Sequence, residues 1–516
     1  MKNIRFGWDY LHYSKQTEIK KIIEKNFSGF SPDGIYPNDS DTLPLFDLEY
    51  QPTNAWHNIV NILEHHHQPK MTLIHKDTTD FIKDNESFVY IIATNGGPEL
   101  WCGGDTERNT LFHNIKEHTK EHIRKGKVVV TIDLSFEGFP IDGTDEMSVL
   151  DMGRHPHLAE TVHKRAEEEK FPIENIVFLS ANHKDVEYYK EWCEEKNIKK
   201  PMNWILLDWC EKAISSDFKH LEDTFEDNFN YKKDNIDTIK HYLCLCRRLK
   251  TPRIFHHLGL NYFNLLDKGS VSCILPKWEI RSVFKDIDRT KMEMNNAGEV
   301  TFSDCATEDD TEFNKTLKDS VFLDDIVDEW WTKFNHFGAL GRRRYLFPLR
   351  RKKNIKSFLK KLPLLVDKTS FNTLDSFHHW YTKLYKDTMF SYVYETWSMS
   401  TNMVFFSEKI YKCILNYHPF LGMINYQTID FMKRNGYKSF SPWIDETYDI
   451  ISDPDERSEY LFKELQSLCE MPINKLLDWY GAQSDVLIHN REVFMTNKHL
   501  ENSTKQFLKV WEKHYE

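Results

Sequence analysis

Short continuous runs of apolar residues, separated by charged amphipathic segments, dominate the first half of the chain. The runs cover residues 88–94 (FVYIIAT), 127–134 (KVVVTIDL), 175–182 (NIVFLSAN) and 203–209 (NWILLDW). Apolar runs of this length without polar alternation are typical of parallel strands that helices bury on both faces. The pattern predicts a Rossmann-like α/β lobe in the first half.

The same alternation returns in the second half, after a polar stretch at residues 222–237 that we interpret as a linker. Strands are expected at residues 241–247, 270–275, 390–396 and 419–423, and helices at 405–417 and 426–435. Gly436 follows the second of these helices as a C-terminal cap. The last ~50 residues read as helical.

The 516 residues allow two or three domains. We predict an α/β protein of the GT-B class, in which two Rossmann-like lobes enclose a cleft and the C-terminus is helical. Residues 1–235 would form the N-terminal acceptor lobe. Residues 236–470 would form the donor lobe, with a basic and acidic insertion near 290–365, and residues 471–516 the C-terminal helices.

Charge and cysteine content limit the kinds of ligand and the cellular compartment that we expect. The net charge is -12, so any contact with a polyanion must come from a local patch. The nine cysteines are scattered without a CxxC pair, which indicates reduced thiols rather than a disulfide framework. No stretch approaches ~18 apolar residues, so we expect a cytoplasmic protein, in the host cytoplasm if a phage encodes it.

Candidate chemistry gathers around residues 394–440. Ser407 is a good helix N-cap, and Glu408 and Lys409 follow in the first turn. The start of a helix carries unpaired N–H groups and a positive dipole end, which suit a diphosphate, and Lys409 adds a full charge. The alternative is that Glu408 only favours the helix N-terminus electrostatically.

The segment FFSEKI at residues 405–410 resembles the donor-site motif of α1,3-fucosyltransferase-like GT-B enzymes. It is also similar to glycosyltransferases encoded by phages and marine bacteria, whose further elements match Glu395-Thr396, GYKSF at 436–440 and DETYD at 445–449. The resemblance implies that Glu408 binds the donor ribose and Lys409 the diphosphate. Ser407 stands where the family has Thr.

A second element of the resemblance closes the strand at 241–247. Arg247, Arg248 and Arg253 match a pattern in which one arginine grips the donor phosphates, although Cys246 replaces the usual Asn. The arginine fork suits phosphate oxygens. The alternative is a basic surface turn. The donor would be a UDP- or GDP-sugar, and no metal is expected, since the acidic triplets at 286–288 and 453–455 follow no clear strand.

The catalytic base is expected in the first lobe. A carboxylate deprotonates the acceptor hydroxyl in inverting enzymes of this kind. Asp133, Glu137 and Asp105 all follow strands or lie in glycine-bearing loops, and Glu137 is the preferred candidate.

Residues 342–361 contain ten Lys or Arg residues and no acid. Interleaved aromatic residues make this stretch a candidate for contact with DNA. The predicted nucleic-acid-binding residues are Arg342, Arg343, Arg344, Arg350, Arg351, Lys352 and Lys353. A solvated face or an oligomer contact are the alternatives.

These patterns predict a glycosyltransferase that moves a sugar from a nucleotide diphosphate sugar to an acceptor hydroxyl. The first acceptor hypothesis is a hydroxymethylated pyrimidine of phage DNA, and a cell-surface polysaccharide or other glycan is the second. A non-catalytic nucleotide-binding protein of the same fold is a further alternative.

Overall fold

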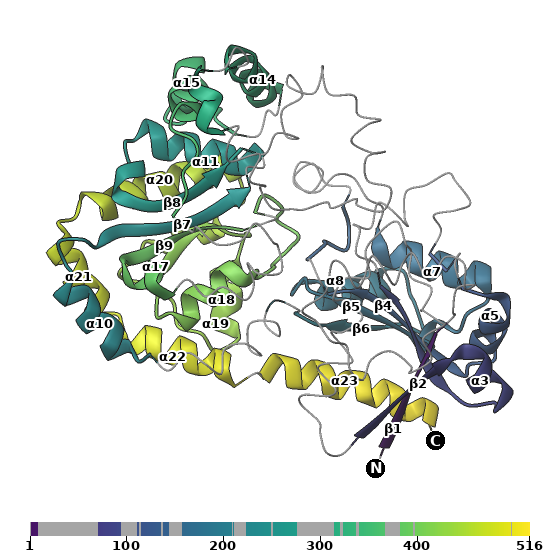
Figure 1. Ribbon diagram of the computed structural model, residues 1–516. Helices are drawn as coiled ribbons and strands as arrows, with labels where there is room; N and C mark the ends of the chain where they lie inside the picture. Colours follow the sequence, from purple (N-terminus) through teal and green to yellow (C-terminus); the bar gives the residue numbers. More distant parts are fainter. Residues whose placement is uncertain are drawn as a thin grey trace. The chain divides into compact units, whose positions relative to one another are not determined.

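The computed structural model of the protein describes fifteen stretches of the chain. These stretches fold into two compact units (Figure 1). The described residues are 2–8, 71–93, 111–112, 115–135, 138–143, 157–208, 210, 223–248, 251–275, 314–319, 323–336, 340–366, 382–395, 398–496 and 498–515. Unit 1 comprises Met1–Lys212, Asn402–Phe405 and Asn497–Glu516. Unit 2 comprises Ala213–Thr401 and Phe406–Thr496.

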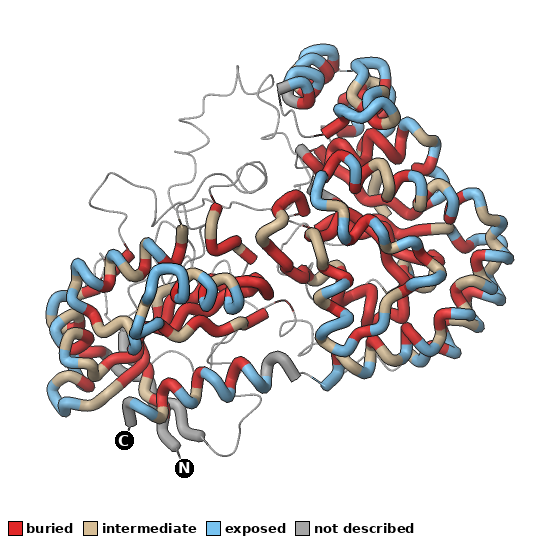
Figure 2. The backbone as a smooth tube through the Cα atoms, turned by 180° about the vertical axis from the view of Figure 1, so that it is seen from behind, coloured by how far each residue is buried: buried red, intermediate tan, exposed pale blue. Residues whose placement is uncertain are grey.

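Unit 1 is built on a six-stranded sheet in the order β2-β1-β3-β4-β5-β6, and all described pairings are parallel. Its strands are β1 (Lys2–Trp8), β2 (Met71–Asp77), β3 (Phe88–Ala93), β4 (Val128–Leu134), β5 (Ile176–Ser180) and β6 (Asn203–Leu206). Every residue of β4 and β5 is buried, and Figure 2 shows mostly buried backbone at the centre of this unit. This explains their uninterrupted apolar sequences.

Helices cover both faces of this sheet. They are α3 (Thr78–Lys83), α5 (Glu117–Arg124), α7 (Leu158–Glu169), α8 (Asp185–Glu195) and α23 (Lys498–Tyr515), with the 3-10 turn η2 (Ile173–Asn175). Val128 and Val130 face a core shared with α5, α7 and α8. Val129 between them faces a second core, which contains Val510 and Trp511 of α23. The two-residue period of the strands therefore sorts their side chains into two cores.

Unit 2 is built on a four-stranded parallel sheet in the order β10-β9-β7-β8. The strands are β7 (Lys240–Arg248), β8 (Gly269–Ile274), β9 (Thr388–Tyr394) and β10 (Phe420–Met423). The chain adds β8 on one side of β7 and then β9 and β10 on the other. The order therefore reverses between β7 and β9, which is the topological switch point of this sheet.

The helices of unit 2 surround this sheet (Figure 1). In chain order they are α10 (Phe225–Asp234), α11 (Thr251–Tyr262), η4 (Leu266–Lys268), η7 (Leu317–Asp319), α14 (Leu323–His336), η8 (Phe347–Arg350), α15 (Lys352–Leu359), α17 (Thr382–Lys386), α18 (Glu408–Leu415), α19 (Thr428–Arg434), η9 (Glu446–Ile450), α20 (Pro454–Glu470), α21 (Ile473–Gly481) and α22 (Ser484–Met495).

The prediction of an α/β protein with two Rossmann-like parallel sheets and C-terminal helices is confirmed. All eight expected strands are present, whereas β1 and β2 were missed. The stretch interpreted as a linker is instead helix α10, which begins with a reciprocal capping box between Thr224 and Asp227. The domain boundaries expected after residues 235 and 470 stay predictions.

Candidate functional site

The carboxyl ends of β7 and β9 lie at the switch point of the second sheet, where open α/β sheets bind ligands. Arg247 and Arg248 are the last residues of β7, and α11 begins three residues later. Glu395 directly follows β9. The topology therefore brings both sequence motifs to one edge of the sheet.

Ser407 begins α18, as its sequence predicts. Its hydroxyl accepts a hydrogen bond from the backbone N–H of Lys409 at 3.3 Å. The backbone N–H of Ser407 donates in turn to Glu395 Oε1 at 3.1 Å. Both residues are buried. The carboxylate after β9 therefore fixes where α18 starts.

Glu408 and Lys409 form an ion pair at the start of this helix. Lys409 Nζ lies 3.0 Å from Glu408 Oε1 and donates to Ser407 Oγ at 3.2 Å. Each of the two side chains keeps 20% of its surface exposed. They are thus held in place and still accessible to a ligand.

Charges from three elements meet here. Desolvation lowers the pKa of Lys409, but the carboxylates of Glu408 and Glu395 outweigh it and hold the pKa above its ordinary value. The positive charge of Arg253, in the first turn of α11, opposes this rise in the pKa of Lys409. We call Arg253, Glu395, Ser407, Glu408 and Lys409 the switch-point cluster.

The two carboxylates of the cluster differ in their surroundings. Desolvation raises the pKa of Glu408. The positive charges of Lys409 and Lys412 together outweigh this effect, so the pKa of Glu408 lies below its ordinary value. Burial dominates at Glu395 and raises its pKa. Glu408 is therefore the firmly ionised acid of the pair, and a hydrogen-bond acceptor for hydroxyl groups.

Several predicted site residues lie wholly or partly outside the described structure. The backbone of Arg247 and Arg248 ends β7, but their side chains lie outside the described part of the structure. Glu137, the preferred base, and Asp105 lie outside the described residues as well. Asp133 is described, and its Oδ1 accepts from the backbone N–H of Ser135 at 2.9 Å.

Two polar features of the described structure were not predicted from the sequence. Lys412 lies one helical turn beyond Glu408, and its positive charge lowers the pKa of that carboxyl group. The i, i+4 spacing in the sequence could have indicated this interaction. In unit 1, His183 Nε2 lies 3.2 Å from Asp208 Oδ2, and both side chains are buried. These residues follow β5 and β6, so only the pairing of those strands reveals their contact.

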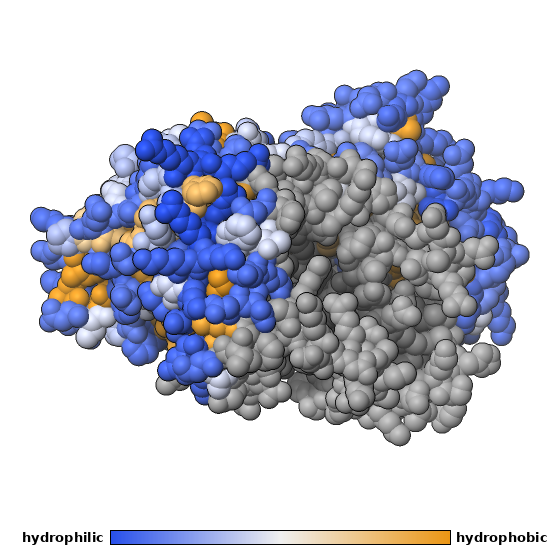
Figure 3. Space-filling model, turned by 90° about the horizontal axis from the view of Figure 1, so that it is seen from above, coloured by the Kyte–Doolittle hydropathy of each residue, from blue (hydrophilic) through white to orange (hydrophobic). Residues whose placement is uncertain are grey.

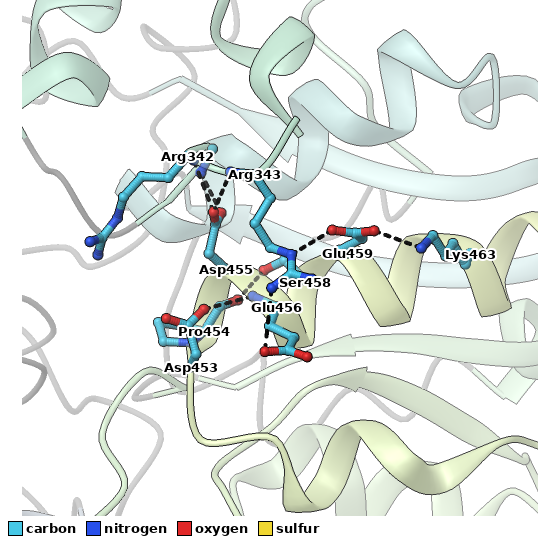
Figure 4. Close-up of polar contacts among 10 residues, drawn as sticks. Arg342, Arg343, Asp453, Pro454, Asp455, Glu456, Ser458, Glu459 and Lys463 are labelled. Carbon is cyan, nitrogen blue, oxygen red and sulfur yellow. Dashed lines mark hydrogen bonds and ion pairs between the residues drawn. The ribbon is translucent and has the colours of Figure 1, made fainter. Parts of the chain in front are cut away.

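The basic stretch begins with a backbone anchor (Figure 4). The carboxylate of Asp455 in α20 accepts hydrogen bonds from the backbone N–H groups of Gly341, Arg342 and Arg343. The Arg343 side chain pairs with Glu456 at 3.3 Å and Glu459 at 2.6 Å, whereas that of Arg342 points away from these acids. Arg343 is thus engaged within unit 2.

The acidic triplet at 453–455 has structural partners. Asp453 caps α20 through the backbone N–H of Glu456 at 2.7 Å, and Asp455 holds the backbone anchor described above. The triplet at 286–288 lies outside the described residues. Within the ranges that the structure describes, no group of three or more His, Cys, Asp or Glu side chains is arranged to hold a metal ion.

Among the described residues, no helix is both long and apolar enough to span a bilayer.

Comparisons with known proteins give fold-level similarity only. No protein-family model and no curated protein matches the chain. Solved structures that match include UDP-forming α,α-trehalose-phosphate synthases from Burkholderia xenovorans (10% identity, 95% of this chain and 85% of that one, TM-score 0.34) and Burkholderia vietnamiensis (8%, 99% and 99%, 0.38). The N-terminal domain of Candida albicans trehalose-6-phosphate phosphatase matches at 9% identity over 99% of this chain and 97% of that one, with a TM-score of 0.38. At these scores the similarities carry no argument about residues or activity.

Proposed function

We propose that the protein is a nucleotide-sugar-dependent glycosyltransferase whose donor diphosphate binds at the switch-point cluster. The observation that carries this proposal is topological: Arg253 lies in the first turn of the helix after β7, Lys409 lies in the first turn of the helix after β9, and β7 and β9 flank the switch point. Two cations from different elements at a switch point are a fitting arrangement for a diphosphate.

The charge balance supports an anionic ligand. Arg253, Lys409 and Lys412 provide three cations against the carboxylates of Glu395 and Glu408. Arg247 and Arg248, which end the adjacent strand, remain proposed donor-binding residues. A diphosphate would neutralise the excess, while the ionised Glu408 accepts hydrogen bonds from ribose hydroxyls.

In the proposed reaction the bond between the sugar carbon and the diphosphate oxygen breaks as the acceptor oxygen attacks that carbon. Negative charge then develops on the departing diphosphate, where Lys409, Arg253 and the start of α18 stabilise it. No metal is required for this step. Glu137 remains our proposal for the group that takes the proton of the acceptor hydroxyl.

For the acceptor we propose a hydroxymethylated pyrimidine in DNA, with a cell-surface polysaccharide as the second candidate. The observation that favours DNA is the density of cations at residues 342–361 on an otherwise acidic chain. A glycan acceptor without phosphate groups would not need them.

The test has two stages. Binding of UDP and GDP is measured first by calorimetry, for the protein, for Lys409→Ala and for the control Lys475→Ala, whose exposed side chain lies on α21. Loss of a charge-assisted contact should weaken binding about 10- to 100-fold in the first variant and leave the control unchanged.

The second stage offers candidate nucleotide sugars with hydroxymethylated DNA or with glycans, and mass spectrometry detects the product. A mass gain of one sugar identifies the acceptor. Nucleotide binding without any transfer or donor hydrolysis would support the alternative of a non-catalytic binding protein. Absence of nucleotide binding would reject both readings.

A further inference from the structure

Seven cations of the basic stretch have no acidic partner among the described residues. Three of the ten are paired: Arg343 with α20, Lys352 with Asp328 at 2.7 Å, and Lys356 with Asp324 at 2.5 Å. The seven others are Arg342, Arg344, Arg350, Arg351, Lys353, Lys360 and Lys361. All but Arg350, which is half-buried, are exposed. This excess of positive charge contrasts with the net charge of -12 for the whole chain.

Two large aromatic rings are exposed among these cations. Trp331 of α14 is 41% exposed and Phe347 of η8 is 45% exposed. The guanidinium of Arg350 lies 4.7 Å from the centre of the Phe347 ring, and that of Arg351 lies 5.7 Å from it. Lys352 Nζ lies 5.0 Å from the centre of the Trp331 ring. We call these five residues the basic-aromatic surface.

Packing holds this surface rigid from behind. Asn354 of α15 donates to the carbonyls of Leu258 and Leu349, and Asn261 of α11 donates to Asn354 Oδ1 at 2.8 Å. Asn354 and Asn261 are buried. The Asp455 anchor fixes the other end of the segment (Figure 4). The cations and rings are therefore presented on a fixed scaffold, which reduces the entropy that a ligand must offset on binding.

The mixture of rings and cations selects one class of polyanion. Among the described residues of the range 323–366, the large hydrophobic residues that are exposed are Trp331 and Phe347, and the face of unit 2 in Figure 3 is mostly hydrophilic between its hydrophobic patches. A membrane-docking surface needs a contiguous apolar patch that enters the headgroup region. Two exposed rings beside cations instead match unpaired bases that stack while neighbouring phosphates bind Lys and Arg.

We propose that the basic-aromatic surface is a binding site for single-stranded nucleic acid, in which Trp331 and Phe347 stack with bases and the surrounding cations bind phosphates. Binding at this surface does not depend on sugar transfer or on a bound nucleotide sugar. The inference deepens the DNA arm of the proposed function, which draws on the same basic stretch, and its test uses no sugar donor.

The experiment measures fluorescence anisotropy of a labelled oligothymidylate of about 20 nucleotides, without nucleotide sugar, at several salt concentrations. The variants are Trp331→Ala/Phe347→Ala and Arg351→Ala/Lys353→Ala, with Lys475→Ala/Lys505→Ala as the control on exposed lysines elsewhere. An abasic oligomer of equal length separates stacking from charge. Circular dichroism and melting curves confirm that each variant is folded.

The expected result is micromolar or tighter binding of oligothymidylate that weakens with salt. Loss of both rings should weaken this binding about 5- to 100-fold and leave the weaker binding of the abasic oligomer unchanged. Loss of two cations should weaken both and reduce the salt slope by about 1.4. The lysine control should bind as the unaltered protein does.

Three results would overturn the proposal: no oligomer binding at low salt, equal binding of the abasic oligomer, or an unchanged affinity in the double aromatic variant. Binding to phosphatidylserine vesicles without binding to the oligomer would identify a membrane surface instead. Because no sugar donor is present, these results are independent of the test for glycosyl transfer.

Discussion

At the scale of single residues, the start of α18 shows which contacts a sequence encodes and which it leaves open. The Ser407 cap follows from local spacing alone, and the structure has it where the sequence predicts it. Glu395 accepts a hydrogen bond from Ser407, twelve positions along the chain, and Arg253 lies in the helix that follows a different strand. Such contacts depend on how the strands pair, which periodicity does not fix.

The opposite pKa shifts of Glu408 and Lys409 predict how nucleotide binding depends on pH. The lowered pKa of Glu408 stabilises the folded protein at pH values above 4.5, and this stabilisation is lost as the pH falls through the pKa of the folded state. The raised pKa of Lys409 stabilises the folded protein at pH values below 10.5, and this stabilisation is lost as the pH rises through the pKa of the folded state. The pair is thus fully charged throughout the range between them.

Affinity for UDP should therefore stay constant between about pH 7.5 and 8.5 by calorimetry. The variant Lys409→His supplies the contrast when both proteins are measured from about pH 5.5 to 8.5. Imidazole loses its charge near pH 6.5, so the affinity of this variant relative to that of the unaltered protein should fall as the pH rises through that value. A tenfold loss for the unaltered protein between about pH 7.5 and 8.5 would show that Lys409 does not hold the phosphates.

At the scale of elements, the strands are the most predictable part of this fold. All eight apolar runs are strands because burial on both faces demands continuous apolar sequence. The missed strand β1, KNIRFGW, alternates polar and apolar residues, and β2, MTLIHKD, is similarly mixed. Helix α10 was missed for a related reason, since its mostly polar sequence conceals the capping box at Thr224.

The Asp455 anchor predicts the stability of the basic segment. In Asp455→Asn, one carboxylate oxygen becomes an amide donor that faces backbone N–H groups, so acceptors are lost and burial leaves a donor unsatisfied. The free energy of unfolding in urea should fall by about 1–3 kcal/mol. Glu456→Gln, on a half-exposed ion pair, is the matched control and should change it by less than about 0.5 kcal/mol. Equal effects in the two variants would contradict the anchor.

Close packing of α11 on α20 gives a prediction for Gly259. A Cβ atom there would lie 2.0 Å from the ring of Phe462, which also stacks on His256 with ring centres 5.0 Å apart. Gly259→Ala should destabilise the protein by about 1–3 kcal/mol in thermal or urea unfolding. Combination with Phe462→Leu should recover part of this loss. An additive double variant would mean that the helices are not in contact at this point.

At the scale of the whole molecule, the chain builds two compact units and crosses between them repeatedly. Unit 1 takes residues from three stretches, Met1–Lys212, Asn402–Phe405 and Asn497–Glu516. The switch-point cluster lies entirely in unit 2, whereas α23 covers the sheet of unit 1. Damage to one unit should therefore be separable from the function of the other.

Trp511→Ala tests this separation. Trp511 of α23 is buried against the sheet of unit 1, so its loss should cost about 3–5 kcal/mol and increase hydrogen exchange in β4 and β5. Nucleotide affinity should remain within twofold of the unaltered protein, as measured by calorimetry at low temperature. Protection of β4 that persists while UDP binding disappears would contradict this division.

The placement of α23 also has a consequence for biosynthesis. A ribosome releases the six strands of unit 1 long before it releases Phe507, Val510 and Trp511, which close the second core of that sheet. All of unit 2 emerges in the interval, and one apolar face of the nascent sheet waits without its native cover. We therefore expect nascent chains that end before residue 507 to bind ribosome-associated chaperones more strongly than the full-length chain does.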